Sequence, residues 1–345
     1  MIDWPYIIKA AIAAPSADNS QPWLFEISEN RLTLRIDPSR SGGTSDQSFF
    51  LSDFSIGTVI CNIEEICSCL GYHCETSILP EATKNPFTAA ICTITPSTAN
   101  ETDSSHIFSR HTDRSFPWSD KLSQEQRNEL EQAVNSKNDS HLHWLDGKRR
   151  KSALKILCNA ESLRFKTKEL HNELFSSIRF DVNWKAAVDE GLAPASLGIE
   201  WFARPVFRLS RHWKIMKLFN IFGAHNAFAF RSTALPCLLS PELGLISINS
   251  SSRESVIRGG IAFQSLWLKA TQMGYSLQPF AATGVLCLAE HLPIPNSSKT
   301  AVIDAIRELS NSPYGLIFFR LGKARQPFNP SSLRRKPAAF GVTQT

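Results

Sequence analysis

The sequence predicts an α+β fold built from two modules, and three observations point to it. The chain has 345 residues, which is more than one compact domain usually holds. Helical and strand-like patterns are interleaved along its length. A helical stretch at 53–72 is repeated at 257–275, and both copies end in a Gly-Tyr pair. We therefore expect a first module over residues 1–100 and a second over 106–345, joined by the polar stretch 96–105.

The first module begins with an amphipathic helix, because apolar residues recur at helical spacing until Pro15 ends the pattern. A hairpin follows, with its turn at Glu29 and Asn30. A long helix then closes at Gly71, which can take up the left-handed conformation of a helix C-terminus. The expected elements are a helix over 2–14, strands over 24–27 and 32–36, a helix over 53–70 and a strand over 89–95.

The second module shows a capping box, because Ser123 is followed three residues later by Gln126. A second long helix ends at Gly274, just as the first ends at Gly71. The expected elements are a strand over 141–145, a mainly helical region over 150–230 with a loop at 190–200, strands over 235–239 and 243–248, a helix over 255–272 and a strand over 315–321.

Composition excludes several classes of protein. With 42% hydrophobic and 20% charged residues, the chain can bury a large core and is not disordered. Its net charge of +5 is small and scattered, so we expect no nucleic-acid partner. The one dense basic run, 148–151, is typical of a solvated helix face. No run of about 18 apolar residues is present, so we expect no membrane partner.

The eight cysteines form no Cys-x-x-Cys pair and most lie in apolar runs, so we expect free thiols and no metal site. The N-terminal stretch lacks the basic region of a signal peptide. These features favour a cytoplasmic location.

Two motifs carry the chemistry. Residues 15–23 read Pro-Ser-Ala-Asp-Asn-Ser-Gln-Pro-Trp, and residues 110–116 read Arg-His-Thr-Asp-Arg-Ser-Phe. Taken singly, the first is compatible with an ordinary turn and the second with a solvated charged stretch. Together they resemble the motifs of the nitroreductase family, and most closely its single-chain, twin-module (Acg-like) FMN-binding subgroup. The resemblance implies a nitroreductase-like three-layer fold in which two pseudo-symmetric modules each hold a mainly antiparallel sheet flanked by helices.

The resemblance also implies an FMN site between the modules. Arginines suit a phosphate because they give permanently charged, bidentate donors. Ser16 and Asn19 offer polar partners for a flavin ring, while Gln21 and Trp23 are expected to brace the loop. A basic tail containing Arg335-Lys336-Pro337 resembles the family's terminal Arg-x-Pro segment, although an unstructured tail is the simpler reading. The expected cofactor-binding residues are Arg110, His111, Thr112, Arg114, Pro15, Ser16, Ala17, Asn19, Pro279, Phe280, Ala281, Arg334 and Arg335.

The motifs are distributed unequally between the modules. The first module has the Pro-Ser-x-x-Asn loop but only Lys9 as a basic residue before it, and the second has the arginine box without an Asn-x-Gln-Pro-Trp loop. One site therefore has all its parts, and its pseudo-symmetric counterpart lacks both. We expect one FMN per chain.

The resemblance implies an FMN-dependent oxidoreductase that transfers hydride between NADH or NADPH and a small organic acceptor, nitroaromatic or quinone-like, or that converts a biosynthetic intermediate. The flavin itself carries the hydride, so no catalytic side chain is assigned. The stretch 185–230 falls where the subgroup carries a lid, which leaves open a flavin-sequestering protein with little turnover. An α/β interaction module without a cofactor is a third possibility. Pairing of two fused chains into a homodimer is also left open.

Overall fold

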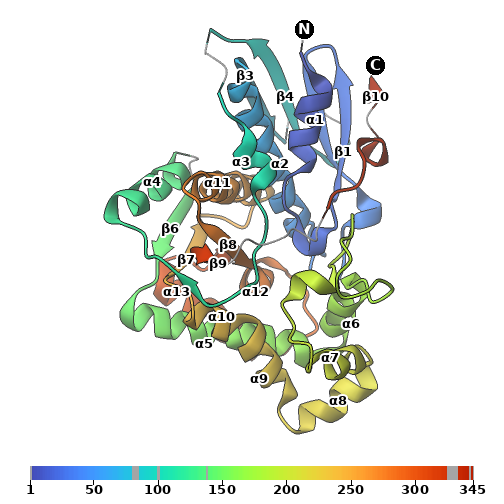
Figure 1. Ribbon diagram of the computed structural model, residues 1–345, viewed down its shortest axis with the longest axis vertical. Coiled ribbons are helices and arrows are strands. Elements are labelled where there is room, and N and C mark those ends of the chain that lie inside the picture. The colour runs from blue at the N-terminus through green and yellow to red at the C-terminus, as the bar shows by residue number, and fades with distance from the viewer. Residues whose placement is uncertain are drawn as a thin grey trace.

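The computed structural model describes residues 2–79, 85–98, 102–136, 139–324, 333–341 and 343–344. Two β-sheets are separated by two long helices, α2 and α11 (Figure 1). The elements before the second sheet are α1 (Trp4–Ile12), β1 (Trp23–Ser28), β2 (Arg31–Ile36), α2 (Phe50–Cys69), β3 (Tyr72–Ile78), β4 (Thr88–Pro96) and α3 (Ser105–Ser109). Residues 80–84 and 99–101, which belong to the expected first module and linker, lie outside the described residues.

The remaining helices are α4 (Gln124–Asn135), α5 (Gly147–Lys166), α6 (Lys168–Ser177), α7 (Arg204–Ser210), α8 (Trp213–Ile221), α9 (Ala224–Ala229), α10 (Leu235–Leu238), α11 (Arg253–Gln272), α12 (Ala282–Leu288) and α13 (Asn296–Ser310). The remaining strands are β5 (Trp118–Ser119), β6 (Ser140–Trp144), β7 (Glu242–Ile248), β8 (Ser276–Phe280), β9 (Gly315–Ala324) and β10 (Thr343–Gln344). The α+β architecture, with antiparallel sheets flanked by helices, is confirmed.

The first sheet has the strand order β10-β1-β2-β4-β3. Its β1–β2 hairpin turns at Glu29, whose φ of +52° gives the tight reversal expected there. Strands β1, β2, β3 and β4 are antiparallel to their neighbours, and only β10, from the C-terminal end, pairs in parallel with β1. Phe340 fastens this returning tail, because its buried ring packs against Trp23 and Phe25.

The second sheet runs β5-β9-β7-β6, with β8 also paired to β9, and all its pairs are antiparallel. Strand β7 is buried along its whole length, which indicates that both of its faces are covered. Residues of β7 and β9 pack into two cores, one shared with α4, α11 and α12 and the other with α5, α12 and α13. The sheet thus lies between two layers of helices.

Helices α2 and α11 cross at two glycines that are 203 positions apart. A Cβ on Gly57 would lie 2.1 Å from the carbonyl oxygen of Ile257, and a Cβ on Gly260 would lie 2.2 Å from that of Phe54. The same offset relates Phe54 to Ile257, so the contact is reciprocal. Such backbone approach requires glycine on both sides. The repeat seen in the sequence therefore has a physical counterpart, in which each copy fits against the other.

Polar contacts reinforce this crossing. Gln264 Nε2 donates to Asn62 Oδ1 over 2.7 Å, and both side chains are fully buried. At the helix starts, Arg253 holds the buried Asp53 carboxylate through two hydrogen bonds of 2.8 and 2.9 Å. The glycines that follow the two helices have the same backbone conformation, since Gly71 and Gly274 have φ values of +73° and +76°.

One sequence prediction of secondary structure is wrong. Within the stretch 235–239, residues 235–238 form helix α10 and not a strand. A short apolar run does not distinguish strand from helix by periodicity, and here the run continues the helical residues 224–234 before it. Helices α12 and α13 were not anticipated.

The eight cysteines all lie in the described residues, and no disulfide joins any two of them. Within the described ranges, no three His, Cys, Asp or Glu side chains gather as metal ligands would. Across the same ranges, no helix combines the length and the apolar character needed to span a bilayer.

Candidate functional site

A cavity of about 980 Å³ lies between the two sheets and the helical region 147–234. Its wall combines the loop after α1, the segment after α3, the end of β8, and residues from α5, α6 and the stretch 192–207. Segments far apart in the sequence therefore meet around one space. Most of the lining is apolar, as in sites that hold flat organic ligands.

The loop after α1 is sharply folded. Asp18, Asn19 and Gln21 all have positive φ, at +49°, +57° and +51°, which non-glycine residues adopt only when their surroundings hold them. Ser16 Oγ accepts a 2.9 Å hydrogen bond from the Gln21 amide and closes the turn. Thr58 of α2 donates to the Pro15 carbonyl over 2.8 Å, which fixes the loop against the long helix.

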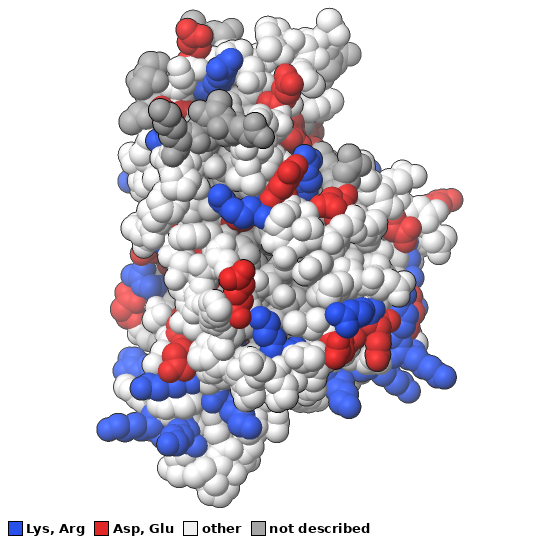
Figure 2. Space-filling model, turned by 180° about the vertical axis from the view of Figure 1, so that it is seen from behind, with Lys and Arg blue, Asp and Glu red and all other residues white. Residues whose placement is uncertain are grey.

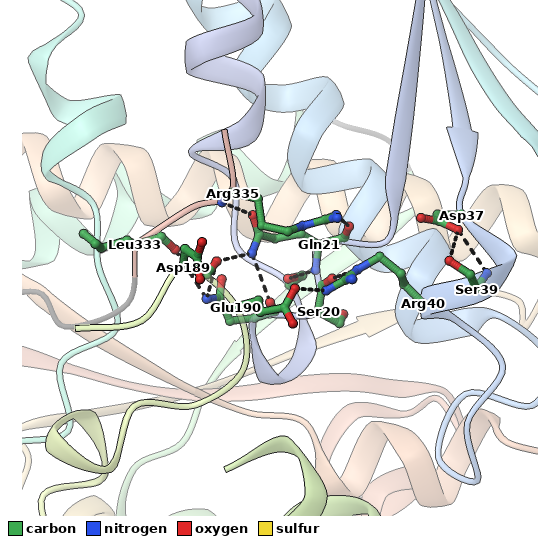
Figure 3. A network of polar contacts seen from close by, with 11 residues as sticks. Ser20, Gln21, Asp37, Ser39, Arg40, Asp189, Glu190, Leu333 and Arg335 are labelled. Carbon is green, nitrogen blue, oxygen red and sulfur yellow. Dashed lines mark hydrogen bonds and ion pairs between the residues drawn. The ribbon is translucent and has the colours of Figure 1, made fainter. Parts of the chain in front are cut away.

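Gln21 is the centre of a polar network that joins three parts of the chain (Figure 3). Its Nε2 donates to the Asp189 carbonyl over 2.7 Å, and its Oε1 accepts from the Arg335 amide over 3.0 Å. Arg40 adds a 2.9 Å ion pair to Glu190 in the same region. The loop, the start of the 185–230 region and the C-terminal tail are thereby held together. Gln21 is fully buried and braces the loop, as its sequence context indicated.

Two arginines converge on the C-terminal end of α1. Arg110 Nη2 donates to the Ala13 carbonyl over 3.0 Å, and Arg334 Nε donates to the Ala14 carbonyl over 3.1 Å. These carbonyls have no partner within the helix, and the negative end of the helix dipole favours a cation there. The arginines from the box and from the tail thus meet at the same place.

This cluster carries more positive charge than its neighbours neutralise. Burial and the nearby Arg334 charge hold the pKa of Arg110 well below its ordinary range, and burial lowers the pKa of Arg334 to about 10. Arg110 stacks 4.4 Å from the Trp267 ring, and its buried Nε and Nη1 have no hydrogen-bond partner among the described residues. A bound anion nearby would relieve the repulsion between the two guanidinium groups.

Ten of the thirteen residues expected at a cofactor site line the cavity: Pro15, Ser16, Ala17, Asn19, Thr112, Arg114, Pro279, Phe280, Ala281 and Arg334. The other three are Arg110, His111 and Arg335, which are not part of its wall. Arg110 lies behind it, against Trp267, which does line the cavity. His111 Nδ1 is 2.7 Å from the Ser109 carbonyl, and Arg335 Nη2 donates to the Gln21 carbonyl over 2.9 Å.

The arginine box and the segment after α11 are joined by backbone pairing. Thr112 forms an isolated parallel bridge with Leu277, and the Asp113 amide donates to the Leu277 carbonyl over 3.2 Å. Thr112 and Arg114 therefore reach the cavity beside Pro279 and Ala281. Burial lowers the pKa of Arg114, although Asp18 and Asp113 act in the opposite direction.

Curated proteins and solved structures resemble parts of this chain. No family model matches the chain. A curated protein of Serratia sp., named probable NAD(P)H nitroreductase PigM, is 26% identical over 195 residues, which are 55% of this chain and 49% of PigM. The chain is similar to nitroreductases. An uncharacterized Mycobacterium tuberculosis protein, MT1398, is 22% identical over 299 residues, 83% of this chain and 39% of that protein. The aligned regions thus span half or less of these relatives.

Solved nitroreductases also match at low identity. The FMN-dependent nitroreductase NfnB of Mycobacterium smegmatis, in complex with NADPH, is 14% identical, and the match covers 64% of this chain and 86% of that chain with a TM-score of 0.35. An FMN-bound nitroreductase of Bacteroides fragilis is 12% identical, and the match covers 68% of this chain and 96% of that chain with a TM-score of 0.35. An FMN-bound nitroreductase of Desulfitobacterium hafniense is 13% identical, and the match covers 66% of this chain and 90% of that chain with a TM-score of 0.36.

The nitroreductase-like motifs gave no indication of the wall of the cavity formed by α5. Glu161 and Arg164 line it, and Arg164 pairs with Asp18 over 3.4 Å and with Glu161 over 3.9 Å. Burial raises the pKa of Glu161. A signal was present, because Glu161 and Arg164 lie on the same helix face as Leu157 and interrupt an otherwise apolar stripe.

Proposed function

We propose that this chain binds one FMN in the cavity and is an FMN-dependent oxidoreductase that transfers hydride between NADH or NADPH and a small organic acceptor, nitroaromatic or quinone-like. The observation that carries the proposal is the meeting of ten motif residues around one cavity, next to buried arginines whose charge is not neutralised. The similarity to PigM supports the same reaction class.

The residues present fit FMN. Its phosphate would lie at Arg114, Arg334 and Thr112, where a dianion would balance the buried guanidinium groups, including Arg110 behind the wall. Its ring would take the apolar part of the cavity beside Pro279 and Ala281. When bound, FMN supplies the two-electron chemistry. The protein's own residues position the reactants and exclude water, and 192–207 forms part of the cover.

We further propose that the chain is a twin-module protein of the Acg-like kind, with modules over 1–100 and 106–345. The reciprocal fit of Gly57 and Gly260 supports a pseudo-twofold relation between the two long helices. Strand β10, near the C-terminus, pairs with β1, so the second module contributes a strand to the first sheet. The lining comes from both modules, which supports one shared FMN.

The test is an absorbance spectrum of the purified protein, followed by anaerobic titration with NADH and then NADPH. We expect a flavin band near about 450 nm, about one FMN per chain, and bleaching by at least one nicotinamide with recovery on adding an acceptor. A flavin that is not reduced would favour a flavin-sequestering protein, which the 192–207 cover makes the second candidate. A colourless protein that takes up no added FMN would refute both.

A further inference from the structure

The stretch 201–241 has an unusual charge pattern. It holds six Lys and Arg residues and no Asp or Glu, while the whole chain has a net charge of only +5. Glu200 and Glu242 bracket it. The basic residues are Arg204, Arg208, Arg211, Lys214, Lys217 and Arg231. Among ion pairs between described residues, only Arg231 of this group takes part in one, with Glu200.

Helices α7 and α8 and the turn after them form a tip at the lower end of the molecule (Figure 1). One side of the tip is anchored. Met216 and Phe207 are buried in a small core with residues of α6, and His171 Nε2 lies 2.8 Å from the Ser210 carbonyl. The tip is therefore a folded part of the protein, and its outward side is a defined surface.

That outward side is apolar. Phe222 is 84% exposed and Ile221 is 75% exposed. Soluble proteins leave single hydrophobic side chains exposed, but seven large exposed ones on two short helices and the turns beside them indicate a surface that something covers. We call this group the apolar tip: Trp201, Phe202, Val206, Leu209, Leu218, Ile221 and Phe222.

Basic side chains lie beside the apolar tip. Lys214, Leu218 and Ile221 follow at helical spacing on α8, so a cation stands one turn above the apolar end. Arg208, Arg211 and Lys217 are also exposed. In Figure 2 the lowest part of the molecule is white, and blue side chains gather just above it on the left. An apolar end below a basic belt is the pattern of segments that lie in a bilayer interface.

We propose that the apolar tip binds peripherally to the surface of an anionic lipid bilayer. Its side chains would enter the headgroup region, and Arg208, Arg211, Lys214 and Lys217 would meet lipid phosphates. Charge favours this occupant over a second copy of the chain, because a twofold contact through the tip would bring the two basic belts together. The sequence-based expectation of no membrane partner rested on the lack of a spanning segment and does not bear on peripheral contact.

The cavity opens beside this surface. Phe202 and Val206 line the cavity, yet they are 66% and 50% exposed. Side chains that face both the cavity and the solvent mark its mouth. Membrane binding would therefore turn the mouth toward the bilayer, although the binding itself does not depend on the proposed flavin chemistry.

Flotation of the full chain with vesicles tests the proposal. We expect binding to vesicles of equal parts phosphatidylglycerol and phosphatidylcholine at low salt, at least tenfold weaker binding to pure phosphatidylcholine, and loss of most binding in about 0.5 M salt. The double variants Ile221→Ser/Phe222→Ser and Lys214→Glu/Lys217→Glu should each reduce binding about tenfold or more. Their circular dichroism should be unchanged, because these side chains are exposed.

The matched control is Lys148→Glu/Lys151→Glu, which removes two exposed cations from the start of α5 and should leave binding unchanged. Equal loss in the control, or no binding by the wild type, would overturn the proposal. So would concentration-dependent self-association that Phe222→Ser abolishes while no vesicle binding is seen. As a measurement on the folded wild type, brominated phosphatidylcholine in the anionic vesicles should quench tryptophan fluorescence, and Trp201→Phe should reduce this quenching. Absence of quenching counts against insertion of the tip.

Discussion

Arg334 donates a 3.0 Å hydrogen bond from Nη1 to Oδ1 of Asn19, and so joins the C-terminal tail to the loop that follows α1. Both residues line the cavity. The next residue, Arg335, turns the other way, with its guanidinium 4.5 Å from the Phe340 ring. Two adjacent arginines of the same tail therefore have separate surroundings, which makes them a matched pair for testing the site.

Arg334→Ala should release FMN, whereas Arg335→Ala should retain it. A lost charge-assisted contact to phosphate costs roughly 1.5–3 kcal/mol, so the dissociation constant should rise about ten- to hundredfold. The measurement is fluorescence titration of the apoprotein with FMN. Circular dichroism of both variants checks their folding. Equal loss of FMN affinity in both variants would contradict a specific contact between Arg334 and the phosphate.

Gln21→Ala should destabilise the protein by about 2–4 kcal/mol. It would leave the Arg335 amide and the Asp189 carbonyl without the partners that the buried Gln21 side chain gives them. Urea unfolding measures the loss. Hydrogen exchange should also become faster in 333–341, and a variant that loses stability without faster exchange there would contradict the bracing role. Gln21→Glu keeps the acceptor but places a buried carboxylate oxygen against the Asp189 and Asn19 carbonyls, so it should be at least as destabilising as Gln21→Ala.

Gly57→Ala should destabilise the crossing of α2 and α11. In an ordinary helix this change gains up to about 1 kcal/mol, but here the new Cβ would lie 2.1 Å from the Ile257 carbonyl oxygen. Overpacking of this kind costs about 1–3 kcal/mol or more. Gly260→Ala should behave alike, because its clash is reciprocal. Ser68→Ala, at an exposed position of the same helix, should be near neutral. A stabilised Gly57→Ala variant would show that the helices do not approach as described.

The pH dependence of stability should carry a contribution from Asp53. Burial raises its pKa to about 6 even though Arg253 acts in the opposite direction. A raised pKa means that the folded state binds the proton more tightly than the unfolded state, so this stability is present below about pH 4 and is lost as the pH rises to about 6. Two pKa units correspond to about 3 kcal/mol.

Asp53→Asn cannot titrate and serves as the reference. The unfolding free energy of the wild type minus that of Asp53→Asn should fall between pH 4 and 6 and stay level above. Denaturant unfolding at several pH values measures this difference. If it instead rises with pH, the ion pair with Arg253 outweighs burial, and the direction given for Asp53 is wrong.

Local features of the fold could be predicted from the sequence, because their causes are local. The proline that ends α1, the capping box of α4 and the glycines after the long helices all act within a few residues. The stretch 235–239 was misread because nothing local separates a short apolar strand from a short helix. Which helix faces Gly57 depends on tertiary packing, and the sequence alone indicated only that two similar helices exist.

The candidate site was predictable in residue type and less so in position. The motifs singled out Asn19, Thr112 and Arg114, and all three line one cavity. It did not reveal that Arg110 stands behind the wall against Trp267, because side-chain direction depends on neighbours that are distant in sequence. The α5 wall was missed since its charged pair lies in a region without motif resemblance.

The pairing of β10 with β1 has a consequence for how the protein is made. Strand β1 emerges from the ribosome about 315 residues before β10, yet β10 forms the edge of its sheet. Until then β1 keeps an open edge, and unpaired edges invite association with other chains. The first sheet therefore passes through biosynthesis incomplete, and a nascent chain stalled before residue 333 would expose the β1 edge that the finished protein covers.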